Sequence, residues 1–287
     1  MMIKYLKCGM ISLLLMCLSM LSVCAQNPYA PIPLWQWDGE VEHGKSELVV
    51  EYVMTFYGTE GLDEVCKDTR IIEIGKGIRK DYSKVLEEAE QRNHKISKEG
   101  GSPSTKLSSD VYPIEVFCFD DGKTRINQRT LLTGPILQYS EECPKFKWTL
   151  VPESMTIEGY KASKAIMEYG GRNWTAWYTE EIPVDGGPYK FCGLPGLIVK
   201  MSSDDGSYTW TMTGIEKKSV PVFEKKFVYR KCTPAEARKL TEEMYKHPFI
   251  FLKNSGVKTL VRDKNGRLVK PGSEQDSISL FYDPIEK

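Results

Sequence analysis

Short stretches in which apolar and polar residues alternate recur along this chain, and they predict a protein built mainly of β-strands. Residues 46–57 are rich in Val, Tyr and Phe, which is typical of a strand. In residues 172–181, Trp174 and Tyr178 fall on one face of the predicted strand and Trp177 on the other. Further strands are expected at residues 69–74, 112–119, 147–151, 155–157 and 163–169.

Turn residues place two hairpins among these strands. Residues 196–202 and 207–214 are expected to pair across an Asp-Asp-Gly turn. An Asn-Gly dipeptide, the strongest short hairpin signal, lies at the centre of a second hairpin at residues 259–269.

Two helices are expected beside the strands. Residues 233–246 begin with Thr233 as N-cap, have Glu236 in position to complete a capping box, and are followed by Pro248. Residues 81–98 contain strong helix formers but only one narrow apolar stripe, which indicates a helix on the surface.

The close spacing of short strands, with turn chemistry between them, is typical of an antiparallel meander. We therefore expect a mainly β (α+β) fold, namely a curved antiparallel sheet or open β-barrel with two accessory helices. Residues 26–287 are expected to form a single domain, in which residues 254–287 supply a hairpin and a polar tail.

The start of the chain has the pattern of an export signal. Lys4 and Lys7 precede an apolar run, and small residues mark a cleavage point after Ala25, so residues 1–25 are expected to be a signal peptide. A competing interpretation is a lipoprotein in which Cys24 is lipidated, although Val stands where such signals usually have a small residue.

Charge and hydropathy narrow the location and the partners of the mature chain. No other apolar stretch is long enough to span a bilayer, so we expect a periplasmic or secreted protein, with outer-membrane association left open. Loss of Lys4 and Lys7 takes the formal net charge from 0 to about −2. Because no basic stripe is present, nucleic acid is not an expected partner.

Five cysteines remain after removal of the predicted signal. An odd number in an oxidising compartment allows two disulfides and one free thiol, and the connectivity stays open. No CxxC pair is present, so neither a thioredoxin-type site nor a zinc knuckle is indicated. The candidate disulfide residues are Cys66, Cys118, Cys143, Cys192 and Cys232.

Residue patterns that support catalysis are sparse. His43, His94 and His247 stand apart from one another and form no HExxH motif, so neither a metal nor a cofactor is expected. Cys192 is a candidate nucleophile, and a disulfide or a buried thiol is the competing interpretation. The carboxylates considered for a hydrolase are Glu181, Asp185 and Asp204. Whether the chain is an enzyme is left open, and these sparse patterns favour a binding protein.

The most distinctive stretch spans residues 171–198, GRNWTAWYTEEIPVDGGPYKFCGLPGLI. In order and spacing it resembles the signature of the GLPGLI family of secreted Bacteroidetes proteins, which is named for the string that ends it. Similarity to the family extends to residues 70–83, 148–165 and 208–216. Because the family has no established activity, the resemblance implies an exported, β-rich protein and no particular reaction.

The signature allows two physical interpretations. The Leu-Pro-Gly string at residues 194–196 suits a type II turn, in which Gly196 accepts a positive φ. In the first interpretation the aromatic side chains fill the core. In the second they form a surface for an apolar or anionic ligand, with charged residues at its edge. The candidate ligand or partner residues are Arg172, Trp174, Trp177, Tyr178, Lys190, Phe191, Leu194 and Pro195.

Three hypotheses of function follow. The first is a non-enzymatic cell-envelope protein that binds a lipid, a peptide or an outer-membrane partner through its curved sheet. The second is a periplasmic hydrolase, supported only by the acidic residues and the thiol near the signature. The third is a structural accessory of an outer-membrane transport or secretion complex.

Overall fold

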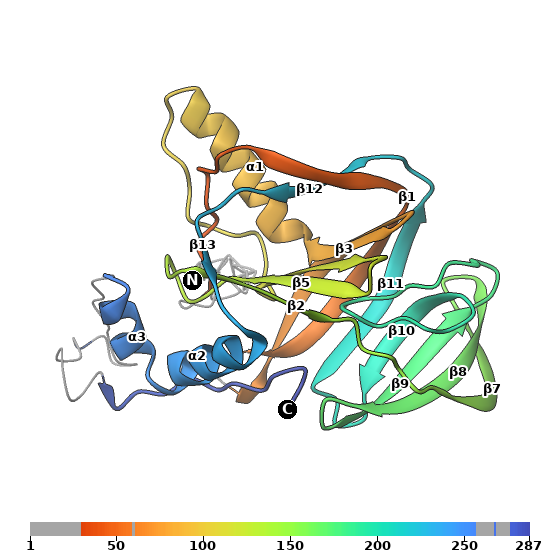
Figure 1. The fold of residues 1–287 in the computed structure, drawn as a ribbon. Helices are drawn as coiled ribbons and strands as arrows, with labels where there is room; N and C mark the ends of the chain where they lie inside the picture. The colour runs from red at the N-terminus through yellow and green to blue at the C-terminus, as the bar shows by residue number, and fades with distance from the viewer. Residues whose placement is uncertain (1–29, 59–60, 257–266, 268–275) are drawn as a thin grey trace, which may run out of the picture.

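The computed structural model describes residues 30–58, 61–256, 267 and 276–287. The expected signal peptide and nearly all of the hairpin expected at 259–269 lie outside the described residues. Within the described part, the chain forms one large sheet with helices at its periphery (Figure 1).

The sheet is built around its longest strand, β1 (Glu40–Gly58), which pairs with β2 (Gly61–Gly75) on one side and β11 (Tyr208–Glu216) on the other. The strands follow the order β13-β6-β5-β4-β3-β2-β1-β11-β10-β9-β8-β7, and β12 pairs with β1. The remaining strands are β3 (Ile78–Ser83), β4 (Ile114–Phe119), β5 (Lys123–Gln128), β6 (Ile136–Glu142), β7 (Thr149–Ile157), β8 (Tyr160–Tyr169), β9 (Arg172–Thr179), β10 (Leu197–Ser203), β12 (Pro221–Lys225) and β13 (Tyr229–Lys231).

The expected curved, open sheet is confirmed, because the strand order does not close on itself. All pairs are antiparallel except β13 with β6, which makes the sheet mixed. β1 bends where its pairing with β12 shifts register between Glu42 and Lys45 and its pairing with β2 shifts between Ser46 and Leu48. Such irregularities kink a strand and increase its twist, so they account for the curvature.

Several strand boundaries differ from the expectation. Residues 147–151 and 155–157 belong to one strand, β7, which is irregular between Val151 and Ser154. Residues 81–83 finish β3 and do not start the following helix. Four further strands were not predicted from the sequence, because they are short and their polar residues break the alternation. These are β5, β6, β12 and β13.

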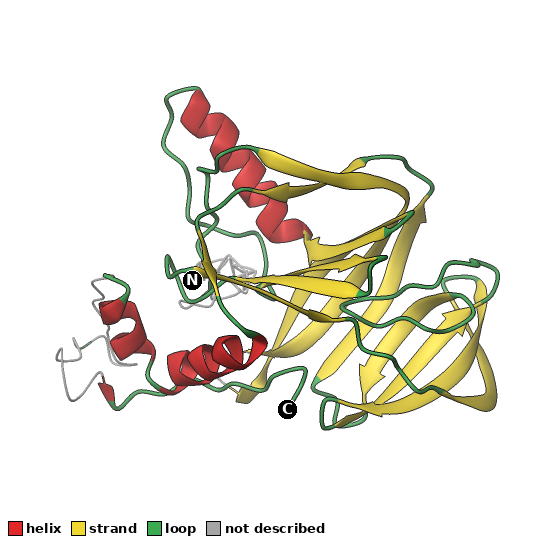
Figure 2. Ribbon diagram, viewed as in Figure 1, coloured by secondary structure: helices red, strands yellow, loops and turns green. Residues whose placement is uncertain are grey.

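Three helices lie toward one end of the molecule, and β7 to β10 lie toward the other (Figure 2). The capping box of α2 (Pro234–Lys246) is present, with Thr233 and Glu236 bonded reciprocally as expected. α3 (Pro248–Asn254) was not expected, because seven residues carry too little periodicity and Pro248 suggested a stop.

The first helix, α1 (Lys84–Lys98), is held to the sheet by a buried carboxylate. Glu90, only 2% exposed, pairs with Arg129 beside β5 and with Lys225 of β12, whose Nζ lies 2.8 Å from Oε2. Lys225 also pairs with Glu87 of the same helix at 2.7 Å, so two cations and two carboxylates join α1 to two distant strands.

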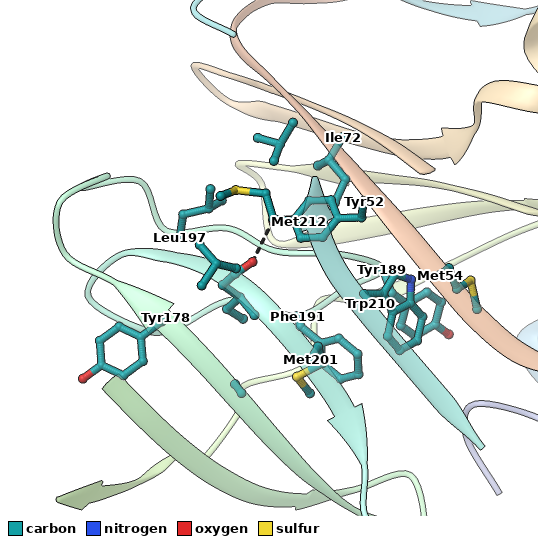
Figure 3. Close-up of a cluster of buried hydrophobic side chains, with 14 of the residues drawn as sticks. Tyr52, Met54, Ile72, Tyr178, Tyr189, Phe191, Leu197, Met201, Trp210 and Met212 are labelled. Atoms are coloured by element: carbon teal, nitrogen blue, oxygen red, sulfur yellow. Dashed lines mark hydrogen bonds between the residues drawn. The ribbon is translucent and has the colours of Figure 1, made fainter. Parts of the chain in front are cut away.

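The main hydrophobic cluster draws most of its buried residues from β1, β2, β8, β9, β10 and β11 and from the signature. Figure 3 shows Tyr52, Phe191 and Trp210 among its buried members. The Tyr52 hydroxyl donates to the carbonyl oxygen of Ile198 at 2.7 Å (Figure 3), so the central strand is tied to the end of the signature. Burial raises the pKa of Tyr52 well above its ordinary value, which keeps this hydroxyl a donor.

Candidate functional site

The signature ends in a tighter turn than expected. The amide of Gly196 donates to the carbonyl oxygen of Leu194 at 2.8 Å, which defines a γ-turn centred on Pro195. Gly196 has no positive φ, so the expected type II turn is wrong. Glycine is required there for another reason: a Cβ at Gly196 would lie 2.1 Å from the carbonyl oxygen of Thr179.

The aromatic residues of the signature divide between core and surface. Trp174 and Phe191 are completely buried, with ring centroids 4.9 Å apart. Tyr178 and Leu194 are also buried, whereas Pro195 is exposed. Trp177 is half-buried on the opposite face of β9, as the alternation predicts, with Nζ of Lys164 5.9 Å from its ring centroid.

Arg172, expected at the edge of a ligand surface, is 4% exposed and contacts the C-terminal part of its own chain. Its guanidinium forms ion pairs with Asp205 and Asp283. It also donates to the carbonyl oxygen of Pro284 at 2.8 Å. The guanidinium therefore holds both a carboxylate and a backbone oxygen of a segment more than a hundred positions away.

Lys190 is likewise buried, at 2% exposed, and pairs with two carboxylates. Its Nζ contacts Glu141 at the end of β6 and lies 2.5 Å from Oε1 of Glu286. The hydroxyl of Tyr189 donates to the same Glu286 oxygen at 2.7 Å. Burial opposes the charge on Glu286, but Lys190 and Tyr189 outweigh it and lower the pKa of Glu286.

Both cations thus bind residues 280–287, which we call the tail segment. Its amide at Leu280 donates to the carbonyl oxygen of Tyr245 in α2 at 2.8 Å, and its amide at Lys287 donates to that of Gly170 at 2.7 Å. Ile285, 3% exposed, joins the main hydrophobic cluster. The tail segment passes alongside α2 on its way to the strands (Figure 1, dark blue). The signature therefore positions the tail segment.

A cavity of about 120 Å³ lies between the sheet, α2 and the tail segment. This volume has room for several water molecules or for a ligand that displaces them. Aromatic side chains from distant parts of the chain line it, among them Phe56, Tyr112, Tyr139, Tyr189, Tyr208 and Tyr245. Of the eight residues proposed from the sequence, only Lys190 is among the residues that line this cavity.

The tyrosine hydroxyls of the cavity stay protonated. Burial raises the pKa of Tyr112 and Tyr189 well above the ordinary value, and raises that of Tyr245 to about 12. The lining therefore combines apolar ring faces with neutral hydroxyl groups. Sequence reasoning missed this lining, because no local pattern links a strand residue such as Tyr139 to a helix residue such as Tyr245.

Arg238 supplies positive charge at the cavity. It lies on the exposed side of α2 and forms no ion pair within the part of the chain that the structure describes. Arg129 also lines the cavity, but its guanidinium pairs with Glu90. Of the three cations in the lining, Lys190 and Arg129 already pair with carboxylates, so Arg238 is the one whose charge is not matched by a carboxylate of the described residues.

The acidic catalytic candidates lie elsewhere and stabilise loops. Glu181, exposed, accepts a hydrogen bond from the backbone amide of Lys161 at 2.9 Å. Asp185 accepts one from the amide of Gly193, and Asp204 one from the hydroxyl of Thr175 at 3.3 Å. Glu181, Asp185 and Asp204 do not line the cavity.

The three histidines are widely separated in the fold. His43 contacts Glu224 at 2.7 Å, and His94 contacts the carbonyl oxygen of Trp35 at 2.7 Å. His247 stands between α2 and α3, where its amide donates to the carbonyl oxygen of Glu243 at 2.8 Å.

The five candidate disulfide cysteines all lie within the described residues, and they form no disulfide. The expected disulfides are therefore not present in this structure. Cys118, Cys143 and Cys192 nevertheless interact with one guanidinium, that of Arg79. Among the described helices, none combines the length and the apolar character that crossing a membrane would require.

Comparison with known proteins gives a family match centred on the signature. Residues 167–200 match the family described as "Protein of unknown function (Porph_ging)". No protein with a curated description matches the chain.

Two solved structures show distant likeness. A structure of PNGF-II in space group P21 aligns with 70% of this chain and 34% of its own, at 15% identity and a TM-score of 0.46. This chain thus spans about a third of that structure's length. A putative outer membrane lipoprotein-sorting protein domain from Vibrio parahaemolyticus aligns with 60% of this chain and 85% of its own, at 9% identity and a TM-score of 0.19. TM-scores this low establish neither a common fold nor a common activity.

Proposed function

We propose that this chain is a non-enzymatic binding protein of the bacterial cell envelope, which holds an amphipathic, anionic small molecule in the cavity beneath the tail segment. The observation that carries the proposal is the cavity itself, with its tyrosine lining and Arg238 beside it. Concave sites lined by aromatic side chains, with a few polar groups to orient the ligand, are typical of small-molecule sites.

The lining favours a molecule with an apolar body and an anionic head, such as a long-chain carboxylate. The rings of Phe56 and Tyr112 would contact the apolar body. The hydroxyl groups of Tyr139 and Tyr245 would donate to oxygen atoms of the ligand, because those of Tyr189 and Tyr208 already donate to Glu286 and Asp283. Arg238 would bind the anionic head, because a guanidinium forms two parallel hydrogen bonds with a carboxylate.

The proposal also includes export of the chain through a signal peptide and its assignment to a protein family. The pattern of residues 1–25 supports a signal peptide, and hence a periplasmic or secreted location with access to the outer membrane. The signature and its family match support assignment to the GLPGLI proteins of Bacteroidetes. Residues 26–287 would then be one β-rich domain of that family.

Titration of the mature chain with cis-parinaric acid, a fluorescent long-chain carboxylate, tests the proposal. We expect saturable binding that an unlabelled fatty acid displaces. Arg238→Ala should weaken it about tenfold, the equivalent of about 1.4 kcal/mol. Lys239→Ala, which changes an exposed neighbour outside the cavity lining, is the matched control. Absence of saturable binding, or equal affinity in both variants, would reject the proposal.

An extended acidic peptide is the second candidate, because the tail segment already binds in this manner. Its carboxylates at Asp283 and Glu286 pair with Arg172 and Lys190, while Ile285 is buried between them. A chain ending at residue 279 should then bind a synthetic peptide of residues 277–287, whereas the intact chain should not. Binding of the peptide by the shortened chain alone, with no binding of cis-parinaric acid to the intact chain, would favour a peptide as the ligand.

A further inference from the structure

Three neighbouring strands place a guanidinium, a thiol and a hydroxyl side by side. Arg79 of β3 is the cross-strand partner of Cys118 in β4, and Cys118 is in turn the partner of Thr124 in β5. Cross-strand partners in antiparallel pairs lie on the same face of the sheet. The strand order therefore builds this row from residues that no local motif connects.

Both neighbours of Cys118 donate to its sulfur. Nη2 of Arg79 donates to Sγ of Cys118 at 3.4 Å, and the hydroxyl of Thr124 donates to the same atom over a longer distance of 4.0 Å. Arg79 is 7% exposed, and Thr124 is completely buried. The sulfur therefore lies between two donors that are fixed inside the protein, one of which carries a full positive charge.

Arg79 lacks an anionic partner. Within the described part of the chain, no carboxylate forms an ion pair with its guanidinium. Nη2 also donates to the carbonyl oxygen of Lys190 at 2.9 Å, and Nε is buried with no hydrogen-bond partner. Because a buried cation without an anion is costly, the surroundings of Arg79 favour negative charge on an adjacent group. Cys118 is the neighbour on which such a charge can form.

The thiol of Cys118 is open to small reagents, because this residue is only half-buried. Oxidation of a cysteine by peroxide depends on exposure and on how well its surroundings stabilise negative charge on the sulfur. The first product, a sulfenic acid, yields an anionic oxygen when it loses its proton. A guanidinium forms strong, charge-assisted hydrogen bonds with such an oxygen. Oxidation of Cys118 would therefore supply the anion that Arg79 lacks.

We propose that Cys118 is a peroxide-sensitive modification site, at which hydrogen peroxide forms a sulfenate that pairs with Arg79. The sulfur attacks one oxygen of the peroxide, so that an S–O bond forms and the O–O bond breaks. The departing hydroxide takes the thiol proton and becomes water. The sulfur loses two electrons in this step, and the peroxide gains them. The sulfenic acid then releases its proton to solvent, and the sulfenate oxygen accepts hydrogen bonds from the guanidinium.

This site is separate from the proposed ligand cavity but is connected to the signature. Neither Arg79 nor Cys118 lines the cavity. Nη2 of Arg79, however, contacts both Cys118 and the backbone of Lys190, the residue that also holds the tail segment. A sulfenate would compete with the Lys190 carbonyl oxygen for this nitrogen. Oxidation would therefore act first on the backbone of the signature.

The experiment treats the reduced mature chain with hydrogen peroxide and dimedone, which traps sulfenic acids, and maps the label by mass spectrometry of peptides. Cys232 is the internal reference, because it is also half-buried and its sulfur contacts a carbonyl oxygen at 3.9 Å. Cys118 should be labelled at least about tenfold faster than Cys232. Arg79→Gln should remove this difference and leave the rate at Cys232 unchanged. Arg125→Gln, which removes a guanidinium from the residue after Thr124, is the control and should preserve the difference.

Circular dichroism of each variant establishes whether the fold is retained. If Arg79→Gln does not fold, the ratio of the two rates in the wild type still decides. Equal labelling of Cys118 and Cys232 in the wild type would overturn the proposal, as would an unchanged ratio in folded Arg79→Gln. A disulfide that joins Cys118 to another cysteine, formed in place of the dimedone adduct, would also overturn it, because the sulfenate would then not persist beside Arg79.

Discussion

Lys190 of the signature forms an ion pair with Glu286, 96 positions further along the chain, with 2.5 Å between Nζ and Oε1. The Lys190 side chain is buried and the Glu286 side chain is partly buried, and the Tyr189 hydroxyl also donates to Glu286. The signature thus has an identified structural role, which is to anchor the tail segment against the sheet beside the cavity.

Glu286→Gln should loosen the tail segment. The substitution removes the charge that Lys190 and Tyr189 bind, although Lys190 keeps Glu141 as a partner. We expect hydrogen exchange of residues 280–287 to accelerate and the free energy of unfolding to fall by about 1.5–3 kcal/mol. Lys287→Gln, at a half-exposed side chain, is the control. If residues 280–287 exchange as slowly in Glu286→Gln as in the wild type, the assigned role is wrong.

Acid should release the tail segment. The pKa of Glu286 is lowered in the folded state, chiefly by Lys190 against the opposing effect of burial. Its contribution to stability is therefore complete above the ordinary glutamate pKa of about 4.3, and is lost as pH falls through the lower folded value. Hydrogen exchange of residues 280–287, corrected for intrinsic rates, should stay constant from pH 7 to about 5 and rise below that. Release already at neutral pH would show that another group controls docking.

Gly196→Ala should disrupt the end of the signature. The added Cβ would meet the carbonyl oxygen of Thr179 at 2.1 Å, so backbone has to move. We expect a loss of about 1–3 kcal/mol in unfolding free energy, measured by chemical denaturation. Gly214→Ala, whose Cβ would meet only the Glu51 side chain at 3.8 Å, should change stability much less. Equal effects of the two substitutions would rule out close approach as the reason for glycine.

Glu90→Ala should be among the most destabilising single changes. It leaves the nearly buried Arg129 without its carboxylate partner and leaves the buried Lys225 with Glu87 alone. Removal of one member of a buried ion cluster typically costs about 3–5 kcal/mol. Glu88→Ala on the exposed face of α1 should cost far less in the same denaturation experiment. A small effect at Glu90 would mean that water reaches the two cations.

Local patterns predicted the parts of the fold that local physics determines. The alternation around Trp174 and Trp177 gave the two faces of β9, and the turn residues gave the hairpin of β10 and β11. The capping box at Thr233 gave the start of α2. Each of these features depends on residues within a few positions of one another, so it can be predicted from a single sequence.

Long-range contacts account for what the sequence did not predict. Asp283 and Glu286 belong to a polar tail without periodicity, so nothing local indicates that they pair with Arg172 and Lys190. The cluster of cysteines around Arg79 likewise depends on the strand order. At the turn around Pro195, Gly196 lies close against the backbone of Thr179, a contact that turn propensities do not include.

A native mass spectrum of the mature chain isolated from the cell envelope tests the central claim most directly. Wild type should carry one amphipathic, anionic molecule that leaves on mild activation. Ile114→Trp, which places a larger side chain in the cavity wall, should be folded and bare. A bare mass for the wild-type chain, or an equal adduct in both proteins, would contradict the assignment of the cavity as the binding site.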